Sequence, residues 1–367
     1  NRGVKVKSEG IELPNGKMIQ EIDEKGYKYL GILQCDQIME KEMKEKVEKE
    51  YFRRLGLLLK SKLNGGNLIK GINAWAVSII RYGAGIISWS KKELKLIDKK
   101  TRFKLTLAGA FHRNSSVDRL YIKRTKGGRG LISVEDCVRA EEGSLTCYAK
   151  KSQEWMLKAV ASRLEKKVDG PDYRKEIQKQ RERRLEEKKL HGKVLKEMKQ
   201  VGTDRNWQWV KRGTLSKSVE GFMFAAQEQT LRTRWKRAKI ENEKISDRCR
   251  ICGKEMETVV HLVAGCEILS KGGYKRRHDK LGLRVYWEMC RKNGIECSEK
   301  WFEEVPDPVR ASKDKKKEIW WDRKFQTSQK MDHIRPDLVL FDREKGECTI
   351  VDFSVPWDKN VQKKEQE

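Results

Sequence analysis

The chain has 367 residues, of which 37% are hydrophobic and 38% are charged, so a single large hydrophobic core is not expected. The formal net charge of +28 indicates a polyanionic partner, and nucleic acid is favoured over a membrane surface. No apolar run approaches the roughly 20 residues that a membrane-spanning helix needs, and no secretory signal heads the chain. No small-molecule substrate is evident from the sequence.

Cysteine usage indicates a reducing compartment. The nine cysteines are an odd number, and most are scattered singly, unlike a disulfide framework. The chain starts at Asn1 without a methionine and stops at Glu367 within a charged run. We therefore expect a fragment of a longer polypeptide. The scattered cysteines are Cys35, Cys137, Cys147, Cys290, Cys297 and Cys348.

The first half of the chain predicts short strands followed by helices. Residues 1–34 end in KGYKYLGI, an aromatic alternation closed by a glycine, which is typical of short strands. Apolar residues then recur at helical spacing, which predicts a small bundle of three consecutive helices and a fourth helix after the glycine turn TKGGRGL. These helices are expected over 36–63, 67–89, 91–108 and about 133–160.

The middle of the chain is strongly charged. Residues 163–200 interleave acidic and basic residues at helical spacing, which predicts a solvated linker helix with no dedicated ligand. Structure is expected to resume over 206–240, in a helix from about Lys217 that ends in basic residues around Trp235. Its inward-facing residues are expected to be Val219, Phe222, Met223 and Ala226. Its basic residues are Arg232, Arg234, Lys236, Arg237 and Lys239.

Two interpretations of this basic end stay open. Cations interleaved with an aromatic ring suit a groove that tracks a nucleic-acid backbone and stacks one base. Alternatively, the cations complement the negative end of a helix dipole and bind nothing.

The stretch CRICGKEMETVVHLVAGC predicts a zinc site. It places cysteine and histidine as C-x2-C-x8-H-x4-C, and Gly253 allows the tight turn that brings the first two thiolates together. Three thiolates and one imidazole close a tetrahedral site with no open position, which is structural rather than catalytic. Basic residues flank the site, and Arg276 and Arg277 in KGGYKRRHDK are predicted to contact nucleic acid, whereas His278 is expected to be only a polar contact. The predicted zinc ligands are Cys249, Cys252, His261 and Cys266.

A hairpin near the carboxyl end carries two acids at equivalent places. Two apolar runs flank the turn DREKGE, and with Glu344 and Lys345 at its centre, Asp337 faces Asp352. Opposed residues have Cβ atoms about 4.5–5.5 Å apart, where like charges repel unless a cation lies between them. Two acids that share a divalent cation are typical of metal-assisted phosphodiester cleavage. The alternative is a surface hairpin with two solvent-facing acids, although the apolar neighbours of Asp352 make an unpaired charge there costly.

Several motifs together resemble one family. The RPD and VDFSVP motifs of the hairpin, preceded by EIWWDRKFQTSQKMDHI, resemble the PD-(D/E)xK restriction-like endonuclease of site-specific non-LTR retrotransposons. KGYKYLGI is similar to the primer grip of their reverse transcriptase, and RYGAGIISW with DRLYIKRTKGGRGL is similar to the thumb. AAQEQTLRTRWKRAKI and the zinc motif resemble the linker and its CCHC knuckle.

The resemblance implies a multidomain, mainly α-helical fragment that acts in target-primed reverse transcription in the nucleus, with DNA and the element's RNA as partners. Asp337 and Asp352 would be the catalytic acids that bind magnesium, and the Cys/His motif would bind structural zinc. The implied parts are the end of the palm and primer grip at 1–34, the thumb and following helices at 35–160, a basic helical linker at 161–245, the zinc knuckle region at 246–290, and a truncated, partial α/β restriction-like endonuclease at 300–367.

Two departures from the family pattern matter. Ser354 stands where the lysine of the nuclease motif is expected, and the replacements available on the next helix are Lys359, Lys363 and Lys364. The paired catalytic aspartates of a polymerase palm are absent, since no DD occurs in the chain. The fragment is therefore not expected to polymerise by itself. A domesticated or decayed zinc-containing protein that binds RNA and DNA without catalysis is the alternative.

Overall fold

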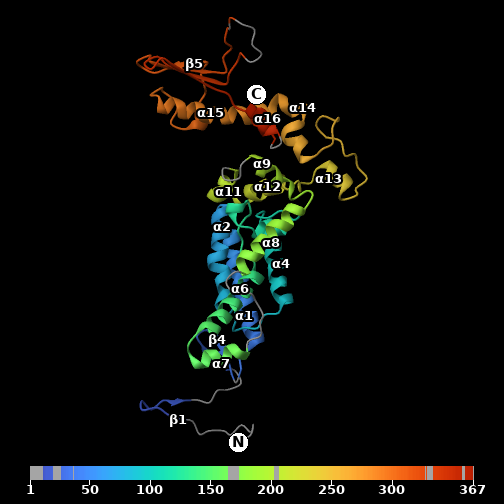
Figure 1. Ribbon diagram of the computed structural model, residues 1–367, viewed down its shortest axis with the longest axis vertical. Coiled ribbons are helices and arrows are strands. Elements are labelled where there is room, and N and C mark those ends of the chain that lie inside the picture. Colours follow the sequence, from blue (N-terminus) through green and yellow to red (C-terminus); the bar gives the residue numbers. More distant parts are fainter. Residues whose placement is uncertain are drawn as a thin grey trace. The chain divides into compact units, whose positions relative to one another are not determined.

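The structure, a computed structural model, describes residues 11–19, 26–35, 37–163, 173–201, 206–326, 328, 334–357 and 360–366. These residues divide into two compact units, Asn1–Thr230 and Leu231–Glu367 (Figure 1). Helices dominate the described part of the chain, and the strands form small antiparallel sheets. The expected mainly α-helical, multipart architecture is confirmed at this coarse level.

The first unit begins with two antiparallel hairpins and continues as helices. The hairpins are β1 (Ile11–Glu12) with β2 (Met18–Ile19) and β3 (Tyr27–Tyr29) with β4 (Ile32–Gln34). The helices are α1 (Glu40–Lys60), α2 (Gly65–Gly71), η1 (Ile72–Ala76), α3 (Val77–Tyr82), α4 (Lys91–Leu107), α5 (Val117–Tyr121), η2 (Arg124–Lys126), α6 (Val134–Lys151), α7 (Trp155–Arg163), α8 (Tyr173–Glu187), α9 (Lys193–Val201), α11 (Gln208–Arg212) and α12 (Lys217–Gln227).

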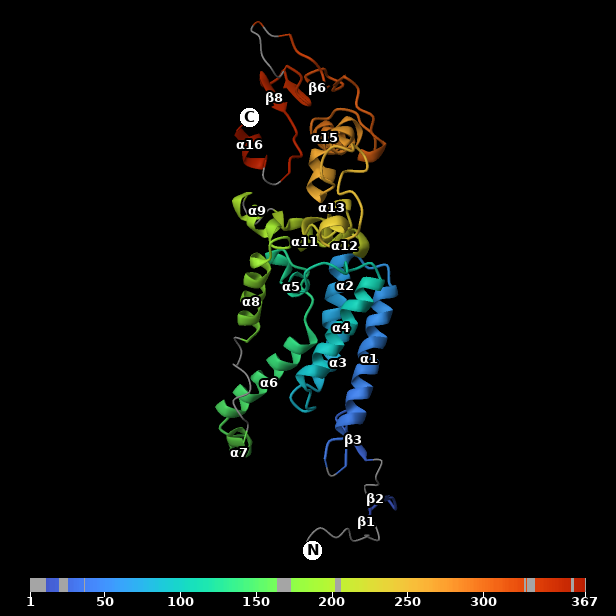
Figure 2. The ribbon, with the colours of Figure 1, turned by 90° about the vertical axis from the view of Figure 1, so that its right-hand side faces the viewer.

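The predicted helical bundle is present in this unit. Helices α1, α3, α4 and α6 contact one another and run alongside each other in Figure 2. Helix α1 buries Met43, Val47, Tyr51 and Leu55, which lie one turn apart on a single face. Buried Asp98 of α4 accepts a hydrogen bond from the Val134 N–H at 2.8 Å, so one helix caps the start of another.

Helix α12 faces the opposite way from the prediction. Val219, Phe222 and Met223 are 47%, 57% and 37% exposed, so the expectation that they point inward is wrong. The buried face instead carries Phe224 and the fully buried Glu220. A carboxylate can occupy this face because two arginines, half-buried Arg124 and buried Arg129, pair with it.

These arginines come from the glycine turn that precedes α6. Arg124 Nη2 lies 2.6 Å from Glu220 Oε2, and buried Arg129 Nη2 lies 2.9 Å from Glu220 Oε1. Buried Arg119, on α5, donates to the Gly127 carbonyl of this turn at 3.0 Å and pairs with Glu228 instead. A carboxylate paired with arginines can be buried where a lone carboxylate could not. The spacing of apolar residues in the sequence gives no indication of such a pair.

The predicted linker belongs mostly to the first unit. Residues 164–172 and 202–205 lie outside the described part, but α8 is not simply solvated, since Arg181 and Leu185 are buried and Arg181 pairs with Asp136. The predicted long helix over 217–240 is two helices, since α12 ends at Gln227 and α13 begins at Arg234. The boundary between the units, after Thr230, falls inside the range expected for the linker, 161–245.

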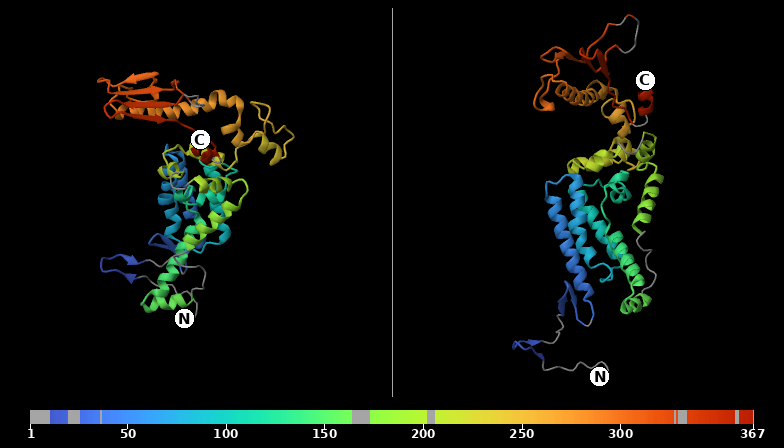
Figure 3. Two further views of the ribbon diagram at one scale, coloured as in Figure 1. Left: turned by 45° about the horizontal axis from the view of Figure 1, so that its top comes forward. Right: turned by 60° about the vertical axis from the view of Figure 1, so that its left-hand side comes forward.

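The second unit joins the loop that carries the candidate zinc ligands to a helix and a four-stranded sheet. Gly282 of α15 lies against Trp321 and Phe353, and the core between helix and sheet includes Tyr286 and Leu338. Figure 3 shows the sheet alongside α15. The elements are α13 (Arg234–Lys239), η3 (His261–Gly265), α14 (Glu267–Leu269), η4 (Ser270–Tyr274), α15 (Lys275–Lys292), η5 (Trp301–Glu303), β5 (Val309–Ala311), β6 (Lys317–Trp321), β7 (Leu338–Asp342), β8 (Glu347–Val351) and α16 (Val361–Gln366), with the strands paired in the order β5-β6-β7-β8.

Candidate metal centre and acidic cleft

The first two cysteines of the zinc motif sit on a tight knuckle. The Cys249 N–H donates to the Glu255 carbonyl at 2.7 Å, and the Gly253 N–H donates to the Cys249 carbonyl at 2.8 Å. Gly253 has φ +72°, a left-handed conformation that glycine adopts without strain. The predicted role of this glycine in turning the chain is therefore confirmed.

The other two candidate ligands are held by one tyrosine. The Tyr274 hydroxyl lies 2.9 Å from the His261 carbonyl, to which it donates, and it accepts the Cys266 N–H at 3.0 Å. The His261 N–H also donates to the Thr258 hydroxyl at 3.0 Å. Backbone atoms of both ligand residues are thus fixed by hydrogen bonds from outside the ligand set.

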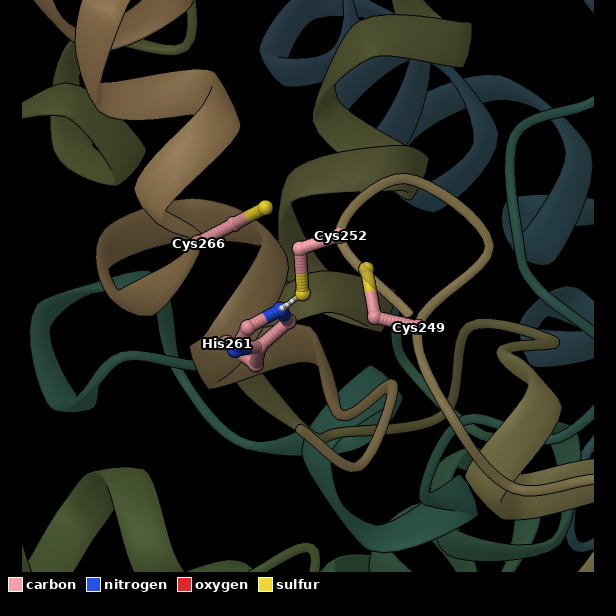
Figure 4. A group of neighbouring side chains, drawn as sticks. All are labelled: Cys249, Cys252, His261 and Cys266. Carbon is pink, nitrogen blue, oxygen red and sulfur yellow. Dashed lines mark hydrogen bonds between the residues drawn. The ribbon is translucent and has the colours of Figure 1, made fainter. Parts of the chain in front are cut away.

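The four side chains converge. One ligand atom each from Cys249, Cys252, His261 and Cys266 lies within 4.8 Å of the others, and Figure 4 shows their tips facing a common point. Cys252 Sγ lies 3.4 Å from His261 Nε2. Three thiols and an imidazole at this spacing fit tetrahedral zinc. Among the described residues, no other group of three or more His, Cys, Asp or Glu ligands meets this condition.

The polar surroundings favour thiolate ligands at one of these cysteines. Backbone N–H groups of Glu255 and Lys254 lower the pKa of Cys252 to about 6. Burial, in contrast, raises the pKa of Cys249 above its ordinary value. Zinc binds thiolates, so a metal at this site would displace the proton from Cys249.

A buried carboxylate braces the knuckle. Glu257 is fully buried and accepts Arg250 Nη2 at 2.6 Å and the Arg234 N–H at 2.9 Å. Burial alone would raise the pKa of Glu257, but hydrogen bonds from Arg250 hold it at about 2. Arg234, predicted to contact nucleic acid, therefore contributes its backbone to the zinc-ligand region.

The other predicted basic residues are largely paired with local acids. Arg232 Nε lies 2.8 Å from Glu241 Oε2, and Arg237 Nη2 lies 2.7 Å from Glu243 Oε2. Lys236 is buried. The sequence interpretation overlooked these acids, which follow the basic helix directly.

The remaining predicted contacts differ in their surroundings. Trp235 is half-buried, and Arg276 is exposed and lines a cleft. Arg277 turns inward, where Nη1 donates to the Val263 carbonyl at 2.9 Å. Arg276 is thus available to a ligand in the cleft, whereas Arg277 ties α15 to the zinc-ligand turn.

The hairpin has the predicted register. Leu338 pairs with Val351 and Asp342 with Glu347, so the next pair outward is Asp337 and Asp352. Asp352 is exposed, so the expected cost of burying its charge does not apply. Burial raises the pKa of Asp337 above its ordinary value, and the neighbouring Asp352 charge adds to this effect.

The structure adds a histidine to this pair. His278 Nε2 lies 3.2 Å from Asp337 Oδ2 and 3.1 Å from the Phe353 carbonyl. The expectation that His278 is only a polar contact missed this arrangement. Burial alone would lower the pKa of His278, but its contacts with Asp279 and Asp337 raise it above its ordinary value.

A third acid lies at the same end of the sheet. The Asp322 N–H donates to the Asp337 carbonyl at 2.9 Å, so β6, β7 and β8 each place an acid at this end. Asp322 adopts φ +47°, and its carboxylate lies 2.8 Å from Arg335 Nε. No spacing in the sequence pointed to Asp322, and its one local signal is its place directly after the aromatic pair Trp320 and Trp321.

His278, Asp322 and Asp337 line a cleft of about 620 Å³ between α15 and the end of the sheet. Its wall combines acids with cations, a pattern that fits a metal ion bound to a phosphate. The acids are Asp279, Asp322 and Asp337, and the cations are Lys275, Arg276, Lys280 and Arg335.

The described candidates for the lysine of the nuclease motif do not line the cleft. Lys359 lies outside the described residues, and Lys363 and Lys364 are exposed on α16. The lysines that line the cleft, Lys275 and Lys280, come from α15 instead.

Comparison with protein families found none that matches the chain, and comparison with curated proteins found no match. In the described ranges, no helix is both long enough and apolar enough to cross a membrane.

Proposed function

We propose that the chain is part of a non-LTR retrotransposon protein, an RNA-directed DNA polymerase with a DNA endonuclease, that acts in target-primed reverse transcription. The first unit supplies the thumb, and the second supplies a zinc knuckle and part of a restriction-like nuclease site. The protein works in the nucleus on chromosomal DNA and the element's RNA. The observation that carries this proposal is the facing of Asp337 and Asp352 across the hairpin, with Asp337 lining a cleft that also holds basic residues.

The residues at this site fit a divalent cation of the magnesium type. Carboxylate oxygens are the ligands that such hard cations prefer, and the cation would balance the repulsion between the two acids. When bound, magnesium polarises a phosphoryl oxygen and activates a water molecule. Asp337 and Asp352 would hold the ion, and Lys275, Arg276 and Lys280 of α15, which line the cleft together with Asp337, would bind the phosphate.

Zinc has a structural role in this proposal. The four Cys and His residues would leave no open position on a bound zinc for a substrate, so the ion would stabilise the loop that precedes α15 rather than take part in hydrolysis. Helix α15, which follows the loop of candidate zinc ligands, carries Lys275, Arg276 and Lys280 of the cleft, so the loop and the cleft belong to the same structural unit.

The test is a DNA-nicking assay with the full chain, zinc-loaded, in magnesium. Asp337→Asn should lower nicking by more than about 100-fold, since even partners of metal ligands contribute roughly 10–100-fold. DNA affinity should stay within about threefold. The matched control is Glu347→Gln, which removes an exposed acid at the other end of the same hairpin and should cut normally. Unchanged nicking by Asp337→Asn would remove this residue from the site.

A second candidate function is nucleic-acid binding without catalysis. It is favoured by Ser354 at the expected lysine position. It predicts that the wild-type chain binds DNA and RNA but cuts neither at any magnesium concentration. The nicking assay therefore separates the two functions before any variant is made.

A further inference from the structure

His278 connects three elements at the cleft. It lies in the first turn of α15, and its ring reaches Asp337, which precedes β7, and Phe353, which follows β8. Its side chain is half-buried, and its other nitrogen, Nδ1, lies 3.2 Å from Asp279 Oδ1. A histidine that was simply exposed on the surface of a helix would make none of these contacts.

The contacts close a ring around one carboxylate oxygen. Asp337 Oδ2 accepts the Phe353 N–H at 2.7 Å and lies 3.2 Å from His278 Nε2. The Phe353 carbonyl lies 3.1 Å from the same nitrogen. One oxygen of Asp337 therefore has a hydrogen-bond donor, the Phe353 N–H, and an ionic neighbour, His278 Nε2, and together these contacts orient the carboxylate.

The same ring of contacts also fixes the backbone next to Asp352. Phe353 follows Asp352 directly, and both its N–H and its carbonyl belong to the ring. The phenyl ring of Phe353 packs against Gly282 of α15, so the backbone at this point is anchored on two sides. The two acids are thereby held beside each other past the last paired residues of β7 and β8.

We propose that His278 is a positioning residue of the acidic site, which holds Asp337 and the Phe353 backbone so that the other Asp337 oxygen and Asp352 share one divalent cation. This inference rests on the proposed nuclease function, because it assigns the cation to that site. His278 touches the acids rather than the reacting phosphate.

The test measures binding of Mn²⁺ alone to the zinc-loaded full chain by electron paramagnetic resonance, without DNA. His278→Ala should weaken Mn²⁺ binding by about 10–100-fold, as for other groups that orient metal ligands. His278→Gln, whose amide nitrogen can reach the place of Nε2, should restore most of the affinity, whereas His278→Asn, which is shorter, should not. Glu288→Gln, elsewhere on α15, is the control and should bind as wild type.

The outcomes separate this inference from the proposed function. Mn²⁺ affinity of His278→Ala equal to wild type, alongside loss of binding in Asp337→Asn, would overturn the role of His278 and leave the acid site intact. A different result would show that His278 only ties α15 to the sheet. In that case His278→Gln and His278→Ala lose Mn²⁺ affinity equally, and the unfolding temperature of the zinc-loaded protein without Mn²⁺ falls in both. Wild-type protein that binds no Mn²⁺ would refute both.

Discussion

At the scale of single residues, hydrogen bonds to the backbone decide how the candidate ligands are presented. Tyr274 contacts the backbone of both His261 and Cys266, yet its hydroxyl is not itself a ligand. His278 acts similarly on Asp337 and Phe353 at the acidic cleft. Both residues lie at or next to the start of α15, so one helix terminus supports both sites.

Tyr274→Phe should weaken zinc binding. The substitution keeps the ring but removes the donor to the His261 carbonyl and the acceptor of the Cys266 N–H, so the second pair of ligands loses its fixed spacing. We expect zinc affinity to fall by about 10-fold, at the lower end of the range for groups that orient ligands. Competition with a chromophoric chelator measures the affinity.

Two further variants set the lower and upper limits of the expected effect on zinc affinity. Tyr148→Phe, at a position 65% exposed, should leave the affinity unchanged. Cys252→Ser should lower it much further, because it removes a ligand. A zinc affinity of Tyr274→Phe equal to wild type would mean that the turn holds its shape without the hydroxyl.

The sequence predicted the residues of the candidate zinc site but not all those of the acidic cleft. The Cys and His ligands lie within one short segment, where spacing alone brings them together. Asp337 and Asp352 lie on one hairpin, where the turn sets the register. His278 and Asp322 come from other elements, and only tertiary packing brings them to Asp337, so spacing carried no signal for them.

At the scale of elements, helix α12 shows why apolar periodicity chose the wrong face. Val219, Phe222 and Met223 form an apolar stripe that is exposed, whereas Glu220 is fully buried against Arg124 and Arg129. The long helix α1 was predicted well because its buried face, Met43, Val47, Tyr51 and Leu55, is hydrophobic through several turns. An element anchored by buried charge gives no such pattern.

Glu220→Ala should therefore destabilise the first unit strongly. It leaves Arg129 buried without its carboxylate partner, and breaking a buried pair in this way costs about 3–5 kcal/mol. Val219→Ser, one residue away on an exposed position, should change the free energy of unfolding by less than about 0.5 kcal/mol. Urea denaturation followed by circular dichroism measures both. A larger effect for Val219→Ser than for Glu220→Ala would contradict the observed facing of α12.

At the scale of the whole molecule, net charge and its distribution determine the expected partner. The net charge is +28, but several predicted contact residues near α13 are neutralised by Glu241 and Glu243. The cleft instead gathers Lys275, Arg276 and Lys280 on one face of α15. Composition alone indicated a polyanion, and only the structure separates paired cations from those grouped around a cleft.

DNA affinity should therefore fall steeply with salt, and the cleft should account for part of the slope. Each phosphate neutralised contributes about 0.9 to the slope of log affinity against log salt concentration. Replacing Lys275, Arg276 and Lys280 together by glutamine should reduce the slope by about 2–3 if each contacts one phosphate. Fluorescence anisotropy with a labelled duplex, measured between about 50 and 200 mM salt, gives the slope.

The control for this triple variant must remove basic charge elsewhere in the same unit. Lys313 and Lys315, in the exposed turn between β5 and β6, lie away from the residues that line the cleft. Replacing both by glutamine lowers the net charge but should leave the slope nearly unchanged. Equal changes of slope in the two variants would mean that DNA responds to the total charge of the chain, and the cleft would then lose its assignment as the phosphate-binding surface.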